Sequence, residues 1–187
     1  MAKWISQMMV SADGFFEGPD REIGWHQVDG EYNAYTSGLL ESVEAILFGR
    51  VTYELMADYW PTAAAVDNDR VAGHMNRLRK YVATHTLQHA SWHNTTVLSG
   101  DIADSYVGLQ PPGGGDVAIL GSGTLAASMS QADLIDEYQL IVNPVVLGSG
   151  RPFLSRLNPR MRLELAEVKA FRSGNVLLVY RSLTARR

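Results

Sequence analysis

The chain has 187 residues, a length typical of one folded domain with its own core. With 46% hydrophobic and 19% charged residues, its composition is that of an ordinary globular protein. The absence of cysteine excludes disulfides, thiolate zinc sites and a cysteine nucleophile, and fits a reducing cytosol. The formal net charge of -4 argues against a protein built to neutralise nucleic-acid phosphates. No stretch reaches the ~18 apolar residues of a membrane span. We therefore expect one cytoplasmic domain over residues 1–187 that binds neither nucleic acid nor a membrane.

Hydrophobic spacing predicts alternating strands and helices in the first part of the chain. Tyr32, Tyr35 and Leu39 recur at helical spacing, and Asp29 stands before them as a candidate N-cap. Pro61 is expected to end a later helix. In chain order the pattern predicts a strand at 3–10, a helix at 31–40, a strand at 44–48, helices at 52–59 and 68–79, strands at 80–84 and 95–98, and a helix at 101–109.

The remaining part of the chain predicts a strand at 116–120, a helix at 123–132 and a strand at 135–143. Two later runs, 161–172 and 175–183, flank Ser173-Gly174, which favours an antiparallel hairpin. In the first run the apolar residues Leu163 and Leu165 have odd numbers, whereas Val168 has an even number, so in a regular strand they would point to opposite faces. A strand pattern of period two switches faces only where a residue is inserted, so we expect a bulge near Ala166-Glu167.

This order of elements predicts an α/β fold with three layers, helices covering both faces of a mixed, mostly parallel sheet. The C-terminal hairpin would add the antiparallel strands. In such folds ligands bind beyond the carboxyl ends of the strands, where the helix N-termini point.

The segment 118–125 runs from an apolar strand through two glycines into a helix start. Glycine lets backbone approach a phosphate closely, and free helix amides attract the anion. A tight turn without a ligand is the alternative. Gly121, Gly123 and Ala126 also fit a dinucleotide fingerprint, but Ile141 stands where a Rossmann unit needs an acid ~20 residues further on, so a standard Rossmann domain ranks second. Ser122 lacks the flanking glycine pattern of a hydrolase nucleophile elbow.

Two further strand ends carry groups suited to anions. After the strand at 44–48 come Gly49, Arg50 and Thr52, which offer a guanidinium fork and a helix-capping hydroxyl. The segment Thr84-His85-Thr86 follows another strand and could contact a further anionic group. A surface arginine beside a capping threonine, and a plain polar turn, are the respective alternatives. Together the turns suggest a split site for a diphosphate cofactor.

At these positions the chain resembles the dihydrofolate reductase-like family. Segment 49–52 looks like that family's Gly-Arg-x-Thr, 84–86 lies where the family holds the adenosine 2′-phosphate, and 121–125 looks like its second cofactor loop. Segments 11–15, 134–138 and 144–150 bring the resemblance closer to the C-terminal reductase domain of bacterial riboflavin deaminase-reductases and to its stand-alone relatives.

The resemblance implies NADPH as cofactor and hydride transfer to a small pterin- or pyrimidine-like heterocycle, as in 5-amino-6-(5-phosphoribosylamino)uracil reductase and dihydrofolate reductase. It also implies a homodimer formed through a sheet edge. His85 stands where arginine is common, which leaves NADH open. The zinc deaminase signature is missing, which weakens an assignment to riboflavin biosynthesis. The implied cofactor-binding residues are Gly49, Arg50, Thr52, Thr84, His85, Thr86, Gly121, Ser122, Gly123, Thr124 and Leu125.

Reduction of a C=N bond also needs a proton donor, and Asp13, Asp29 and Glu31 are the catalytic candidates. Each has an alternative reading, as a turn aspartate, a helix N-cap or a solvated helix residue respectively. Trp25, Tyr59 and Trp60 are candidates to line a pocket for a flat ring, although such aromatics are more often core residues.

Two rival functions remain. His85, His89 and His93 recur every four residues and would align as metal ligands on a helix, but the segment reads as strand and loop, so we expect no metal. A nonenzymatic nucleotide-binding module on the same fold is the second alternative, because function belongs to sites and not to folds.

Overall fold

The computed structural model describes residues 2–62, 69–100, 109, 111–155 and 157–184. Most expected elements occur within a few residues of their expected bounds. The expected helix at 101–109 lies, except for Leu109, outside the described residues. The elements are β1 (Trp4–Ser11), β2 (Phe15–Glu17), α1 (Gly30–Ser42), β3 (Ala45–Gly49), α2 (Arg50–Tyr59), α3 (Asp69–Arg77), β4 (Arg79–Thr84), β5 (Thr95–Ser99), β6 (Val117–Leu120), α5 (Gly123–Gln131), β7 (Glu137–Asn143), β8 (Arg151–Pro152), β9 (Leu163–Ala170) and β10 (Val176–Ser182).

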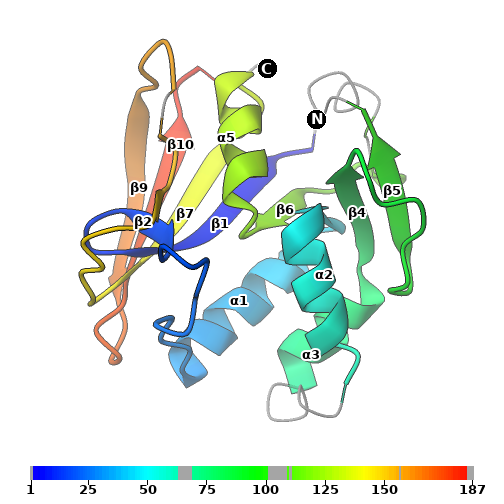
Figure 1. Ribbon diagram of the computed structural model, residues 1–187, viewed down its shortest axis with the longest axis horizontal. Coiled ribbons are helices and arrows are strands. Elements are labelled where there is room, and N and C mark those ends of the chain that lie inside the picture. Colours follow the sequence, from blue (N-terminus) through cyan, green and yellow to red (C-terminus); the bar gives the residue numbers. More distant parts are fainter. Residues whose placement is uncertain (1, 63–68, 101–108, 110, 156, 185–187) are drawn as a thin grey trace.

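The main sheet has eight strands in the order β5-β4-β3-β6-β1-β7-β10-β9. The strands from β5 to β7 are parallel to one another. β10 runs antiparallel to β7, and β9 antiparallel to β10, so the last two strands form the expected C-terminal hairpin (Figure 1). The prediction of a mixed, mostly parallel sheet is therefore confirmed. Strands β2 and β8, which the sequence did not predict, form a separate two-stranded ribbon.

Helices cover both faces of the sheet, which confirms the three-layer architecture (Figure 1). The alternation of side chains along β3 builds both cores. Ile46 and Phe48 belong to the core shared with α1, α2 and α3, whereas Leu47 belongs to the core shared with α5. All three side chains are fully buried. The short apolar strand therefore fits a position covered on both faces, as expected of a parallel sheet.

The expected bulge in β9 is present. Glu167 lies opposite Val179 and Leu165 opposite Tyr180, so Ala166 is an extra residue on β9. The insertion changes which residues of β9 share a face, as the change of hydrophobic parity requires.

None of the helices in the described ranges is both long and apolar enough to cross a membrane.

Candidate functional site

The carboxyl ends of the parallel strands lie along one edge of the sheet. The segments that the sequence singled out follow directly: Arg50 after β3, His85 after β4 and Gly121 after β6. Strand β3 pairs with β4 on one side and with β6 on the other. The three segments therefore come from adjacent strands and open on the same edge, where ligands of α/β sheets bind.

The turns around residues 50 and 122 are in direct contact. The Gly49 N–H donates a hydrogen bond to Ser122 Oγ at 2.9 Å. A Cβ added to Gly49 would lie 3.7 Å from the Cβ atoms of Ser122 and Leu125, and one added to Gly121 would lie 3.4 Å from Thr52 Cγ2. The structure thus brings together, at van der Waals distance, two turns more than seventy residues apart in the sequence.

Two helices begin at this contact. The N-cap of α2 is Gly49, and that of α5 is Ser122; neither cap makes a side-chain hydrogen bond to its helix. The first amides of a helix lack intrahelical partners, and the aligned peptide dipoles place partial positive charge at this end. Both helix starts therefore favour an anion at the same edge of the sheet.

The two glycines of the second turn have different physical roles. Gly121 has a φ of 58°, a left-handed conformation that glycine adopts without strain. A Cβ on Gly123 would come within 2.5 Å of the Phe16 ring. The space beside the Gly123 backbone, where a side chain would lie, is therefore filled by Phe16 from β2.

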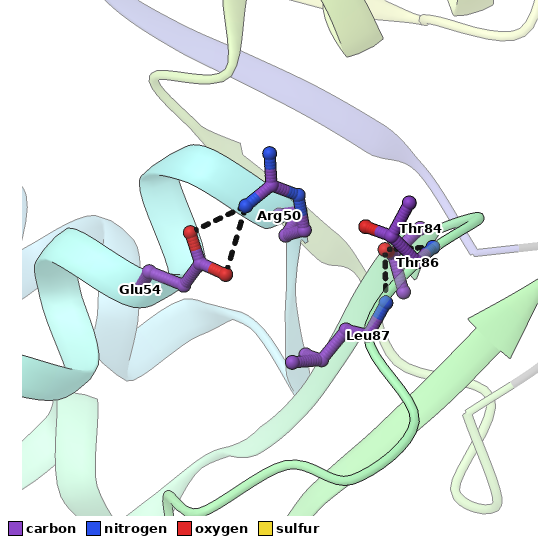
Figure 2. Close-up of polar contacts among 5 residues, drawn as sticks. All are labelled: Arg50, Glu54, Thr84, Thr86 and Leu87. Atoms are coloured by element: carbon purple, nitrogen blue, oxygen red, sulfur yellow. Dashed lines mark hydrogen bonds and ion pairs between the residues drawn. The ribbon is translucent and has the colours of Figure 1, made fainter.

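Arg50 lies at the start of α2, beside the turn that follows β4 (Figure 2). Its Nη1 donates to both carboxylate oxygens of Glu54 at 2.9 and 2.8 Å. The two side chains are 43% and 44% exposed. The guanidinium is thus accessible to a ligand, and a carboxylate already occupies part of its hydrogen-bonding capacity.

The buried Thr84 side chain shapes the turn after β4. Its Oγ1 accepts hydrogen bonds from the backbone N–H groups of Thr86 at 3.1 Å and Leu87 at 3.0 Å (Figure 2). The side chains of His85 and Thr86 are exposed. Thr84 therefore holds the loop, while the next two residues face solvent at the position expected for the 2′-phosphate.

Asp13 joins two loops at the same edge of the sheet. Its carboxylate accepts from Ser11 Oγ at 2.7 Å and from the backbone N–H groups of Gly148 at 2.7 Å and Leu147 at 3.1 Å. These hydrogen bonds, that of the Ser11 hydroxyl first, lower the pKa of Asp13 below its ordinary value. The group is therefore ionised at neutral pH and has an evident structural role.

Asp29 and Glu31 lie at the start of α1. Asp29 is the N-cap, as expected, and accepts from the Tyr32 N–H at 2.8 Å. That bond is the main reason why the pKa of Asp29 lies below its ordinary value. Glu31 accepts from the Arg172 N–H at 2.6 Å and pairs with Arg172 Nε at 3.2 Å. Both carboxylates thus have structural partners.

The candidate aromatic residues do not form one group. Trp25 donates to the Glu22 carbonyl at 3.2 Å and packs edge-on against His26. Tyr59 and Trp60 pack on each other at the end of α2. Because α2 has 10 residues, it spans about 15 Å. Tyr59 and Trp60 therefore lie at the opposite end of the helix from Arg50.

Buried polar residues between β1, β7 and α1 escaped the sequence analysis. Thr36 Oγ1 donates to Gln7 Oε1 at 3.4 Å, and Gln7 Nε2 donates to Gln139 Oε1 at 3.2 Å. All three residues are buried, and the Gln7 carbonyl also accepts from the Gly121 N–H at 3.0 Å. Glutamine within two strands that are expected to be buried was the available signal, because buried amides need specific partners.

A second set of buried polar residues, Asn143 and Asn175, anchors the loop before α1. Asn143 Oδ1 accepts from the Gln27 N–H at 2.8 Å, and Asn175 Nδ2 donates to the Gln27 carbonyl at 2.8 Å. Beside this anchor, burial lowers the pKa of His26 from 6.5 to about 4. Among the described residues its Nε2 has no hydrogen-bond partner. The imidazole is therefore neutral at physiological pH.

The histidines of the metal alternative lie in a segment without helix, between β4 and β5. Their spacing of four residues consequently does not align them. In the part of the chain that the structure describes, no group of three or more histidine or acidic residues is arranged to hold a metal ion.

Comparison with known proteins gives a consistent picture. The family model of the RibD C-terminal domain matches residues 2–177. The uncharacterized protein YyaP of Bacillus subtilis is 28% identical over 177 residues, covering 94% of this chain and 93% of that protein. A putative riboflavin biosynthesis protein of Shewanella superposes with a TM-score of 0.75 at 20% identity, covering both chains completely. Dihydrofolate reductase of Enterococcus faecalis, solved with NADP(H), superposes with a TM-score of 0.65 at 12% identity over 97% of this chain and 96% of that one. The last two likenesses concern the fold.

Proposed function

The chain belongs to the family of RibD C-terminal domains, and from that premise we propose that it is an NADPH-dependent reductase of a small pterin- or pyrimidine-like heterocycle. The observation that carries the proposal is the hydrogen bond from Gly49 to Ser122 at 2.9 Å. It joins two helix starts, so that both sets of amides can bind phosphates of one dinucleotide.

The residues at this edge fit the charge of NADPH. Arg50 provides an exposed guanidinium, whose planar fork suits phosphate oxygens. We assign the pyrophosphate to the segments 49–52 and 121–125 and the 2′-phosphate to the turn 84–86. When bound, NADPH would supply the hydride. The protein's own contribution would be to fix the cofactor relative to the substrate and to exclude water.

The proton must come from a group that carries one near neutral pH. Asp13 and Asp29 have lowered pKa values and accept backbone hydrogen bonds. We therefore assign both to loop and helix organisation. The third candidate, Glu31, is bound to Arg172, and its role as a donor is tested by Glu31→Gln in the oxidation assay. The flat substrate ring would pack near Trp25, which lies in the loop anchored by Asn143, and away from Tyr59 and Trp60.

A cytosolic location and a homodimer belong to the same proposal. Support for pairing comes from β9, which forms one edge of the sheet. Its residues 164–170 are all exposed, among them Leu165 and Val168 at 52% and 55%. An uncovered edge strand presents unpaired backbone groups and apolar side chains to a second copy.

The experiment is a fluorescence titration with NADPH and NADH, followed by an assay of cofactor oxidation with a panel of pterins and pyrimidines. We expect saturable NADPH binding and oxidation with at least one heterocycle. Saturable binding without oxidation would instead favour the nonenzymatic nucleotide-binding module. If neither cofactor bound, the proposal would be wrong.

A further inference from the structure

The ribbon of β2 and β8 packs on the first turn of α5. Its register pairs Phe15 with Pro152 and Glu17 with Arg151. Between the two pairs, the Phe16 ring fills the space above Gly123. The ribbon therefore lies directly beside the helix start to which the pyrophosphate is assigned.

Arg151 connects this ribbon to the helix. Its Nη2 donates to Thr124 Oγ1 at 2.7 Å, and its Nη1 donates to Glu17 Oε1 at 2.7 Å. The guanidinium carbon lies 5.1 Å from the centroid of the Phe16 ring. Three contacts thus fix one cation at the start of α5, and 46% of its side chain is still exposed.

We propose that Arg151 is a further cofactor-binding residue, which holds a phosphate of the dinucleotide at the start of α5. The inference rests on the proposed function. Glu17 holds the guanidinium in place until a phosphate oxygen replaces its carboxylate. Both groups are oxyanions to which a guanidinium fork donates hydrogen bonds in similar geometry, so the exchange requires no large movement of Arg151.

The chemistry of Thr124 supports this role. Its hydroxyl oxygen accepts from Arg151, so its own proton points elsewhere and can be donated to a phosphate oxygen. Guanidinium, hydroxyl and the uncapped amides of α5 then offer donors from one small region. An arginine that only tied the ribbon to the helix would give stability without affecting cofactor affinity, and this difference makes the two roles separable.

The test compares Arg151→Ala and Arg151→Gln with Glu17→Gln, measuring the NADPH dissociation constant by fluorescence titration and the unfolding temperature of each variant. Arg181→Ala is the matched control, because Arg181 lies opposite Glu137 in the β10–β7 register, near the start of β7 and so at the end of the strands away from the proposed site. Loss of a charge-assisted contact should weaken binding by about tenfold or more in both Arg151 variants. The defect should shrink at high salt, as screening reduces the contribution of the charge.

Glu17→Gln should bind NADPH at least as tightly as the wild type, since it removes a competing carboxylate, and Arg181→Ala should bind unchanged. Arg151→Gln retains polar contacts with the ribbon, so it carries the test if the alanine variant unfolds. A folded Arg151→Gln protein with wild-type affinity overturns the inference and leaves the proposed function intact. A wild-type protein that binds neither nicotinamide cofactor overturns both.

Discussion

Ser122 is the residue through which the two turns of the candidate site touch. Its Oγ accepts from the Gly49 N–H and lies near the Leu120 carbonyl. Arg50, on the same turn as Gly49, instead pairs with Glu54 on its own helix. The Ser122 hydroxyl thus connects the two turns by a hydrogen bond, whereas the Arg50 guanidinium pairs with a residue of its own helix. The two features predict different effects of substitution.

Ser122→Ala should destabilise the fold by about 1–2 kcal/mol, because it leaves the partly buried Gly49 N–H without its acceptor. Chemical denaturation measures the change. Ser128→Ala is the control: the same substitution on the same helix removes only an exposed hydroxyl bonded to the Thr124 carbonyl. Equal losses in the two variants would mean that the connection between the turns contributes nothing particular.

Glu54→Gln should strengthen NADPH binding by roughly twofold, since an exposed ion pair of this i,i+4 type is worth about 0.2–0.5 kcal/mol. NADH should gain to a similar extent, because it carries the same pyrophosphate that is assigned to the Arg50 turn. Parallel titrations with both cofactors measure the ratio. Weaker NADPH binding in this variant would show that Glu54 supports the site instead of competing for Arg50.

Among the elements, the segment between β1 and α1 makes several contacts that the sequence did not predict. It contributes Phe16 to the start of α5 and holds His26 beside the anchor formed by Asn143 and Gln27. One loop therefore touches the proposed cofactor turn and the carboxyl end of β7. We expect its packing to govern both stability and access to the site.

Gly123→Ala should destabilise the protein by about 1–3 kcal/mol, because the new Cβ would meet the Phe16 ring at 2.5 Å. In a Phe16→Ala background the same substitution should cost little, since the space is then open. A double-mutant cycle in denaturant gives the coupling. Additive effects would mean that the ring moves aside freely.

His26→Gln should reduce the loss of stability in mild acid. The folded pKa is about 4 and the unfolded one near 6.5, so the folded state binds fewer protons between these values. Stability from the neutral imidazole is therefore complete above pH 6.5 and declines as the pH falls toward 4, by on the order of 2–3 kcal/mol. Unfolding free energies of both proteins across this range measure the difference. Parallel curves for wild type and variant would contradict it.

At the scale of the molecule, local patterns predicted the elements, and the parity change in β9 predicted its bulge, because both depend on neighbouring residues. The contact between the turns around residues 50 and 122 was also expected, since both follow parallel strands. The Arg151–Thr124 bond and the Phe16–Gly123 packing were not. They join residues distant in the sequence through strands of three residues or fewer, which leave no periodic signal.

The central claim is that the turns around Arg50 and Ser122 bind one nucleotide together. Titration of the wild type and of Arg50→Ala with NADPH tests it most directly. We predict one NADPH per chain, and a dissociation constant that rises by about tenfold or more in the variant, as expected for a lost charge-assisted contact. Saturable binding to the wild type with an unchanged constant in Arg50→Ala would contradict the claim.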